Sequence, residues 1–237
     1  MVYLVDVAVC SLNQWALDFT GNRDRIIRSI SQAASYGCKY RSGPELEIPG
    51  YSCQDHFFEP DTEQHCWEML AQIIDASPDD MMIDVGLPVT LRGVRYNCRL
   101  VYINKRIVLI RPKTVLANDH NYREQRWFTG YKSNGEVDSI ELPKCVQKVC
   151  SNQRSAPFGL GFLKLADNIR VGYEICEELW APQSVAIDQS LIQKKLKIRI
   201  YIFTQLYFHF AQKYRRSLNL SHAACHQDED ISFFLQL

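Results

Sequence analysis

Cys176 is the residue of this 237-residue chain whose setting points most directly to chemistry. It follows a predicted strand over Ile169 to Ile175 and begins the word C-E-E-L-W. A cysteine in a sharp turn at the end of a strand can be presented to a cleft, with backbone N–H groups nearby that stabilise an oxyanion during acyl transfer. A free cysteine is more often a small buried hydrophobe, so Cys176 alone does not establish a nucleophile.

Three further ionisable residues are placed to assist such a nucleophile. Glu45 lies in the loop G-P-E-L-E-I-P-G-Y, whose prolines and glycine fix a stiff turn, and it suits a general base, although Glu47 competes for that role. Lys113 follows Pro112, which stops a predicted strand, so its ammonium can hold a developing negative charge. Glu124, in N-Y-R-E, can orient that lysine. Each of these residues, taken alone, is better explained as a solvated surface charge.

The elements that must position these residues are strands in the middle of the chain and helices near its start. Strands are predicted over 2–10, 81–86, 95–103, 106–110, 161–165 and 169–175, with tight turns at Asn104-Lys105 and Asp167-Asn168. Apolar residues at helical spacing predict helices over 23–36, capped by Asn22 and stopped by Gly37, and over about 63–76. This pattern predicts a layered α/β or α+β domain in which helices cover a sheet.

Composition excludes several classes of function. The hydrophobic fraction is 46 % and the charged fraction 23 %, which is ordinary for a globular protein. Lysine plus arginine number 27 and aspartate plus glutamate 27, so the basic excess typical of non-specific nucleic-acid binding is missing. Because none of the nine cysteines forms a C-x-x-C pair, we expect no metal site. Without a secretory leader or a long apolar run, we expect no membrane partner, reduced thiols and a cytoplasmic location.

Taken together, the motifs are far more specific than any one of them. A P-E-L-E loop, a lysine after a strand, N-Y-R-E eleven residues later and the cysteine word form a pattern that resembles the nitrilase-like carbon–nitrogen hydrolases. Longer words, in order along residues 2–188, resemble the glutaminase domain of eukaryotic glutamine-dependent NAD synthetases. These words are L-N-Q-W-A-L-D-F, G-P-E-L-E, R-Y-N-C-R, L-I-R-P-K, N-Y-R-E-Q-R-W-F and E-I-C-E-E-L-W.

The resemblance implies an α-β-β-α sandwich and a Glu–Lys–Cys triad. Cys176 would be the nucleophile, Glu45 the general base and Lys113 the electrostatic stabiliser, with Glu124 supporting the lysine. The backbone N–H of Glu177 would share the oxyanion. Two aromatic residues, Tyr51 and Tyr122, would line the substrate pocket. The implied reaction releases ammonia from L-glutamine through a cysteine thioester, for the conversion of deamido-NAD to NAD.

The chain departs from the family pattern in two places. Residues 1–188 are interpreted as a partial nitrilase-like glutaminase domain, so we expect a sandwich that is incomplete at its C-terminal side. Residues 189–237 are interpreted as a divergent tail, because 189–227 contain no acidic residue and are basic and aromatic, as a shifted reading frame or a retained intron would produce. The Ser/Asn/Gly/His-rich segment that follows the cysteine motif in the family is also missing.

The second departure concerns the synthetase domain. Its S-G-G-x-D-S phosphate loop is absent, and so the ATP and magnesium that the family uses would have no site in this sequence. The glutaminase half needs no cofactor. The resemblance implies that the family's synthetase domain is a partner and that a homo-oligomer forms. Two alternatives stay open: a stand-alone amidase of the same superfamily, and a catalytically inert fragment or regulatory binding subunit.

Overall fold

The computed structural model of the chain describes residues 6–133, 135–165, 169–182, 185, 198–204 and 231–236. In chain order its elements are β1 (Asp6–Leu12), α1 (Phe19–Ser35), β2 (Tyr40–Ser42), the 3-10 helix η1 (Gln54–Phe58), α2 (Pro60–Ala76), β3 (Met82–Leu91), β4 (Val94–Ile103), β5 (Arg106–Pro112), α3 (Glu124–Trp127), β6 (Asp138–Glu141), α4 (Lys144–Val149), β7 (Ser155–Phe158), β8 (Leu163–Lys164), β9 (Ile169–Ile175), the 3-10 helix η3 (Cys176–Leu179), β10 (Ile198–Thr204) and β11 (Ile231–Gln236).

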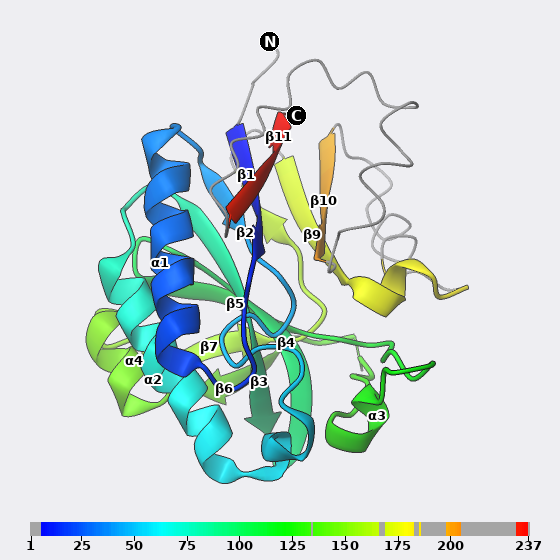
Figure 1. Cartoon of the computed structure of the whole chain (residues 1–237). Coiled ribbons are helices and arrows are strands. Elements are labelled where there is room, and N and C mark those ends of the chain that lie inside the picture. Colours follow the sequence, from blue (N-terminus) through cyan, green and yellow to red (C-terminus); the bar gives the residue numbers. More distant parts are fainter. Residues whose placement is uncertain are drawn as a thin grey trace.

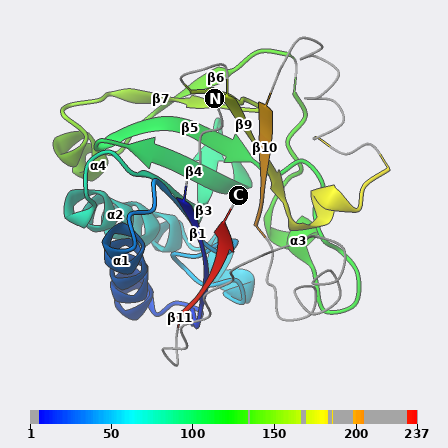
Figure 2. The same ribbon diagram turned by 90° about the horizontal axis from the view of Figure 1, so that it is seen from above.

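The strands form two sheets, which are stacked. The larger sheet has the order β11-β1-β2-β3-β4-β5-β7-β6, and the smaller has the order β10-β9-β8. Helices α1, α2 and α4 lie along one face of the larger sheet, while β9 and β10 lie on its other side (Figures 1 and 2). The described residues therefore form three layers of the expected sandwich, and the second outer helical layer is not among them.

Two apolar cores hold these layers together. The larger core joins the helices to the large sheet, with Ile26, Ile30, Leu70 and Ile73 of the helices and Ile83 of β3 all inaccessible or nearly so. The smaller core joins the two sheets. It contains Tyr40, Met82, Val101 and Leu109 from the large sheet and Val171 and Tyr173 from the small one. The layered α/β fold expected from the sequence is thus confirmed.

The expected hairpin around Asn104 and Lys105 is confirmed. Both residues have positive φ angles, 48° and 54°, and Ile103 pairs directly with Arg106, so the turn reverses the chain between β4 and β5 in two residues. The hairpin of β8 and β9 is also confirmed, by the antiparallel pairing of Leu163 with Val171. Its turn residues Asp167 and Asn168 lie outside the described part of the chain.

The predicted cap of the first helix is wrong. Helix α1 begins at Phe19, and Asp18 caps it by accepting a hydrogen bond from the backbone N–H of Gly21. Asn22 lies inside the helix and is fully buried, and its Nδ2 donates to the carbonyl oxygens of Trp15 at 2.7 Å and of Ile48 at 2.9 Å. Its amide is used for tertiary contacts because a fully buried amide needs hydrogen-bond partners, which these two carbonyls supply. Asn22 therefore ties α1 to the loop that carries Glu45.

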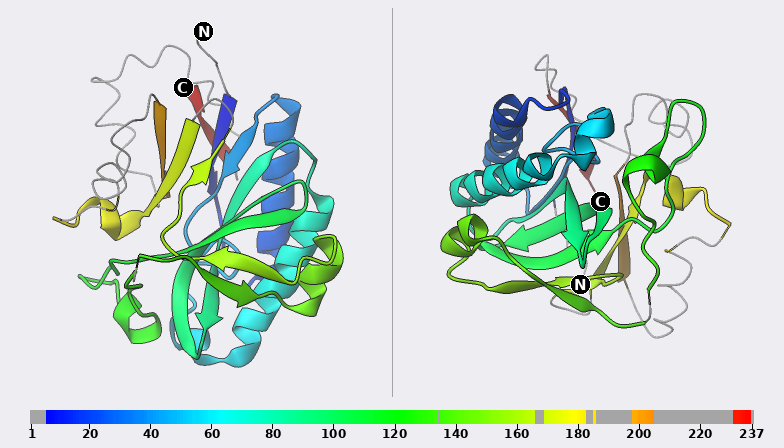
Figure 3. Two further views of the ribbon diagram at one scale, coloured as in Figure 1. Left: turned by 180° about the vertical axis from the view of Figure 1, so that it is seen from behind. Right: turned by 90° about the horizontal axis from the view of Figure 1, so that it is seen from below.

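The other differences are in length. Helix α2 begins at Pro60, a turn before the expected start, since proline is favoured in the first turn. Strand β3 continues to Leu91 because it pairs with β4 from Ile83 opposite Tyr102 as far as Leu91 opposite Val94. Two stretches of the region after residue 188 are strands: β10 pairs parallel with β9, and β11 pairs antiparallel with β1 (Figure 3). The boundary between a domain and a tail at residue 188 stays a prediction.

Charged side chains interrupt the apolar face of the large sheet that meets the small sheet. Arg99 of β4 lies opposite Arg111 of β5 in the strand register, and Leu109 on the same face belongs to the core between the sheets. Because strand side chains alternate, Asn97 and Lys113 point to this face as well. All four polar side chains are buried, at 1 % exposure or less. Burying such groups is costly unless they are paired, so the sheet interface must supply partners for each of them.

Candidate active site

Lys113 is the centre of a buried cluster of charges. It follows the last residue of β5, and its backbone N–H donates to the carbonyl of Asn97 at 2.8 Å. Its Nζ lies 2.7 Å from Oε1 of Glu45 and 2.9 and 2.8 Å from the two carboxylate oxygens of Glu124. Burial alone would lower the pKa of Lys113, but the two carboxylates outweigh it and hold that pKa above its ordinary value. The lysine is therefore a fixed cation between two acids.

Glu45 reaches the lysine from a loop that rests on β3. The loop approaches so closely that a Cβ atom on Gly86 would lie 2.4 Å from the backbone nitrogen of Leu46. Oε1 of Glu45 accepts hydrogen bonds from Lys113 and, at 2.6 Å, from Nδ2 of Asn97. Oε2 is buried and has no hydrogen-bond partner among the described residues. One oxygen thus fixes the carboxylate, and the other is available to accept a proton.

Glu47, the competing acid of the same loop, is used elsewhere. Its carboxylate forms a buried ion pair with Arg41, in which Nη1 of the arginine lies 3.0 Å from Oε2. Arg41 is further held by the hydroxyl of Ser29, at 2.8 Å from Nη2. The structure therefore places Glu45 beside the lysine and gives Glu47 a partner of opposite charge.

Glu124 is surrounded by donors. Besides Lys113, the backbone N–H of Ala117 donates to its Oε2 at 3.0 Å, and the hydroxyl of Tyr51 donates to its Oε1 at 2.5 Å. Burial and the charge of Glu45 raise the pKa of Glu124 to about 7, although the lysine acts to lower it. Burial and the same two carboxylates also raise the pKa of Tyr51, so its hydroxyl stays a donor.

Cys176 begins the 3-10 helix η3, which follows β9 directly. Its φ angle is +48°, a left-handed conformation that non-glycine residues rarely adopt. The thiol is partly buried, and burial together with the charge of Glu45 raises its pKa to about 12, while Lys113 acts to lower it. The resting side chain is therefore a neutral thiol. The charges of Glu45, the predicted base, and of Lys113, the predicted stabiliser, act on it electrostatically. The predicted residues Cys176, Glu45, Lys113 and Glu124 are brought together.

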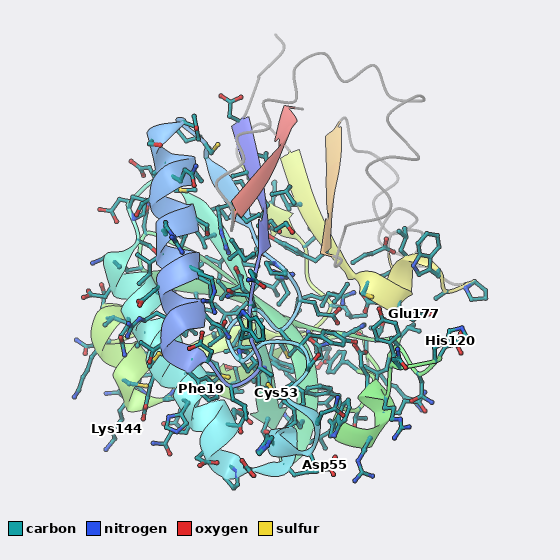
Figure 4. The ribbon with its side chains drawn as sticks, viewed as in Figure 1. Phe19, Cys53, Asp55, His120, Lys144 and Glu177 are labelled. Carbon is teal, nitrogen blue, oxygen red and sulfur yellow. The ribbon has the colours of Figure 1, made fainter. Side chains whose placement is uncertain are left out.

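The remaining predicted residues lie around this cluster. The ring of Tyr122 is 44 % exposed and meets that of Tyr51 edge-on, with centroids 6.0 Å apart. Glu177 lies next to the cysteine in η3 and acts electrostatically on its thiol (Figure 4). Both residues thus border the cluster, and their contacts with a substrate remain predictions.

Two residues of the site were not singled out from the sequence. Asn97 holds Glu45, and Glu178 holds the backbone around Cys176. Each lies in one of the longer words that carry the family resemblance, R-Y-N-C-R and E-I-C-E-E-L-W. For Asn97 the available signal is a polar residue between Tyr96 and Cys98 in a predicted strand, because a polar group in such a position is buried with a specific partner. Glu178 follows the acid Glu177, and the local sequence does not distinguish the two.

Other kinds of site are not seen in the described residues. No three histidine, cysteine, aspartate or glutamate side chains gather there in a way that could hold a metal ion. No helix among those residues is long and apolar enough to cross a membrane.

Comparison with known proteins agrees with this geometry. The sequence profile of the family described as carbon-nitrogen hydrolase matches residues 6–215, which is most of the chain. The chain belongs to this family. The match continues beyond residue 188, into the segment interpreted from the sequence as a tail.

Within the carbon–nitrogen hydrolases, curated relatives include glutamine-dependent NAD(+) synthetases. The human protein is 49 % identical over 188 residues, which is 79 % of this chain and 26 % of the relative. The protein of Saccharomyces cerevisiae is 50 % identical over 192 residues, covering 81 % of this chain and 27 % of the relative. The chain therefore spans about a quarter of the length of these relatives.

Solved structures show the same fold. A glutamine-dependent NAD(+) synthetase from Cytophaga hutchinsonii superposes with a TM-score of 0.65 at 25 % identity, over 81 % of this chain and 34 % of that one. An amidase from Nesterenkonia sp. superposes with a TM-score of 0.57 at 12 % identity, over 84 % of this chain and 64 % of that one. At such low identity the amidase supports the fold alone.

Proposed function

We propose that this chain carries the glutaminase reaction of glutamine-dependent NAD synthetases, in which L-glutamine is hydrolysed to glutamate and ammonia. The single observation that supports this most is the position of Lys113 between Glu45 and Glu124, where all three charges act electrostatically on the Cys176 thiol. A thiol, a base and a fixed cation are the groups that amide hydrolysis through a thioester needs. The likeness to curated NAD(+) synthetases supports glutamine as the amide.

The first half of the proposed mechanism forms a thioester. Oε2 of Glu45 takes the proton of the Cys176 thiol as the sulfur attacks the carboxamide carbon of glutamine. The resulting oxyanion is stabilised by the ammonium of Lys113 and by the backbone N–H of Glu177. The tetrahedral intermediate collapses, the carbon–nitrogen bond breaks, and the proton on Glu45 passes to the leaving amine, which departs as ammonia.

The second half returns the enzyme to its resting state. Glu45, now ionised again, removes a proton from water, and the hydroxide attacks the thioester carbonyl. The same two donors hold the second oxyanion. Its collapse breaks the carbon–sulfur bond, the thiolate recovers the proton from Glu45, and glutamate leaves.

The ammonia would serve the amination of deamido-NAD to NAD in a synthetase domain, which we propose as the partner of this chain. ATP and magnesium belong to that domain's reaction, and no step at Cys176 uses them. We further propose a cytoplasmic location and, as in the family, assembly into a homo-oligomer.

The test is ammonia release from L-glutamine by the purified chain, with Cys176→Ala as the negative control. We expect turnover by the wild type and none by Cys176→Ala, and losses of two orders of magnitude or more for Glu45→Gln and Lys113→Ala. Mass spectrometry after treatment with 6-diazo-5-oxo-L-norleucine, a glutamine mimic with an electrophilic diazoketone, should find the adduct on Cys176. Faster turnover of other amides than of glutamine would favour a stand-alone amidase. A folded chain with neither turnover nor adduct would favour the inert fragment.

A further inference from the structure

The backbone around Cys176 needs support from outside its own segment. The positive φ of Cys176 is unfavourable for a residue with a Cβ atom, and such conformations persist only where the surroundings hold them. The 3-10 helix η3 is only four residues long, which is too short to hold the cysteine by its own hydrogen bonds. Some group must therefore join η3 to the part of the fold that carries the lysine.

Glu178 makes that connection. Its Oε2 accepts a hydrogen bond from the backbone N–H of Ile175, the residue before Cys176, at 2.7 Å. Its Oε1 accepts from the backbone N–H of Thr114 at 2.5 Å, from the Thr114 hydroxyl at 2.7 Å and from Nη1 of Arg111 at 2.6 Å. Thr114 directly follows Lys113. One carboxylate thus accepts hydrogen bonds from Ile175, the residue before Cys176, and from Thr114, the residue after Lys113.

Only a carboxylate satisfies this arrangement. All four groups around Glu178 are donors, and the side chain is fully buried, so no water replaces a missing acceptor. A glutamine at this position would point its amide N–H₂ at either Ile175 or Thr114, where another donor already lies. Arg111 is also fully buried, and its Nε and Nη2 have no hydrogen-bond partner among the described residues. The charge of Glu178 is therefore what balances Arg111.

We propose that Glu178 is a positioning residue for the nucleophile, which holds Cys176 in its left-handed conformation at a fixed distance from Lys113. The carboxylate touches neither substrate nor reacting atoms; it acts through Ile175 and Thr114. This inference rests on the proposed function for its consequence in turnover, but the geometry that it describes can be tested without glutamine.

The experiment compares three variants with the wild type. Glu178→Gln removes the charge and one acceptor. The double variant Glu178→Gln/Arg111→Met removes the negative charge together with the buried cation that would be left unpaired. It therefore avoids the large destabilisation that an unpaired buried arginine causes. Thr114→Val removes one of the four donors and leaves the carboxylate in place. Thermal unfolding defines a temperature at which every variant is folded, and all kinetics are measured there.

Two readouts are taken on each protein. The first is kcat and KM for glutamine; the second is the rate at which iodoacetamide alkylates individual cysteines, followed by mass spectrometry. Cys66 and Cys98 are buried in the core and serve as internal controls for unfolding. In the wild type, the raised pKa of the Cys176 thiol keeps alkylation slow near pH 8.

We expect the first two variants to lose kcat by about 100-fold or more with a smaller change in KM, and Thr114→Val to lose less. In the same two variants Cys176 should be alkylated at least tenfold faster, because the released thiol becomes more exposed, while Cys66 and Cys98 stay protected. Unchanged kcat and unchanged Cys176 alkylation would overturn the proposal. So would faster alkylation of Cys66 and Cys98 in parallel with Cys176, which indicates general loosening.

The two proposals fail separately. If the wild type releases no ammonia from glutamine, but Cys176 alone becomes more reactive in the Glu178 variants, the proposed function is wrong and the positioning role stands. If the wild type is active and the Glu178 variants keep its kcat and its alkylation pattern, the positioning role is wrong and the glutaminase function stands.

Discussion

Lys113 donates a hydrogen bond of 2.7 Å to Glu45, although 68 positions separate the two residues in the chain. The contact joins the end of β5 to the loop that rests on Gly86 of β3. The same ammonium also binds Glu124, so one cation lies between two carboxylates in a site from which water is largely excluded. With both carboxylates ionised, such a cluster carries one negative charge in excess, and it can accept one proton.

This charge balance bears on the proposed chemistry. When Glu45 accepts the thiol proton, its charge disappears at the moment when the tetrahedral oxyanion forms. Lys113 then loses one anionic partner and gains another, so the total charge of the buried site does not change. Because a buried charge without a partner is very costly, a proton transfer that leaves the charge of the site constant lowers the barrier. The raised pKa of the Cys176 thiol agrees with this order of steps, since the mechanism needs no stable thiolate.

Substitutions of the two acids in the loop, Glu45 and Glu47, are expected to cause different defects. Glu45→Gln keeps the size of the side chain but cannot accept a proton, so we expect turnover of glutamine to fall by about 100- to 10,000-fold with little loss of stability. Glu47→Gln removes the negative partner of the fully buried Arg41, so we expect the free energy of unfolding to fall by a few kcal/mol. Steady-state kinetics and urea unfolding of both variants separate these effects. Full activity in Glu45→Gln would show that the base is another residue.

Much of the fold could be predicted from the sequence because it depends on local patterns. The turn at Asn104 and Lys105 and the strands that flank it follow from alternation and from residues that tolerate a positive φ. The acids, the lysine and the cysteine were found because their words occur in a specific order, and the structure brings them together.

What could not be predicted depends on contacts between distant segments. Asn22 matched a cap pattern, but its buried amide donates to the carbonyls of Trp15 and Ile48, and Asp18 takes the cap instead. Glu178 follows an acid of the same type, and nothing in the local sequence tells that one of the two is fully buried against Arg111. Such roles depend on which side chain the tertiary fold removes from water.

The raised pKa of Glu124 predicts a pH dependence of stability. Its pKa is about 7 in the folded protein, against 4.5 as the ordinary value, so between these pH values the folded state holds a proton that the unfolded state has lost. This contribution is fully present below pH 4.5 and is lost as the pH rises through 7. We therefore expect the stability of the wild type relative to Glu124→Gln to fall by up to about 3 kcal/mol over this range, at about 1.4 kcal/mol per pKa unit.

Urea unfolding of both proteins at several pH values between 4 and 8 measures this difference. Because groups remote from position 124 titrate alike in both proteins, the comparison reports the titration of Glu124 together with that of its neighbours Glu45 and Lys113. A relative stability that rises with pH, as an acid with a lowered pKa would give, would contradict the assignment.

The close approach of the Glu45 loop to β3 predicts that Gly86 is needed for activity. The Cβ of Gly86→Ala would lie 2.4 Å from the backbone nitrogen of Leu46 and 3.0 Å from the carbonyl oxygen of Pro44, and backbone atoms cannot yield as a flexible side chain can. The loop must therefore move, and Glu45 moves with it. A displacement of the order of 1 Å in a catalytic group costs about 100-fold in rate, so we expect kcat to fall by roughly 10- to 100-fold.

Gly37→Ala is the matched control for this substitution. Gly37 has a positive φ, +77°, but a Cβ there meets nothing within 4 Å, and the residue lies just past the end of α1. We expect it to lower the free energy of unfolding by about 1 kcal/mol and to leave kcat per folded molecule unchanged. Equal kcat values in the two variants would show that the loop is not held in place by its contact with β3, since backbone crowding at Gly86 must displace whatever rests on it.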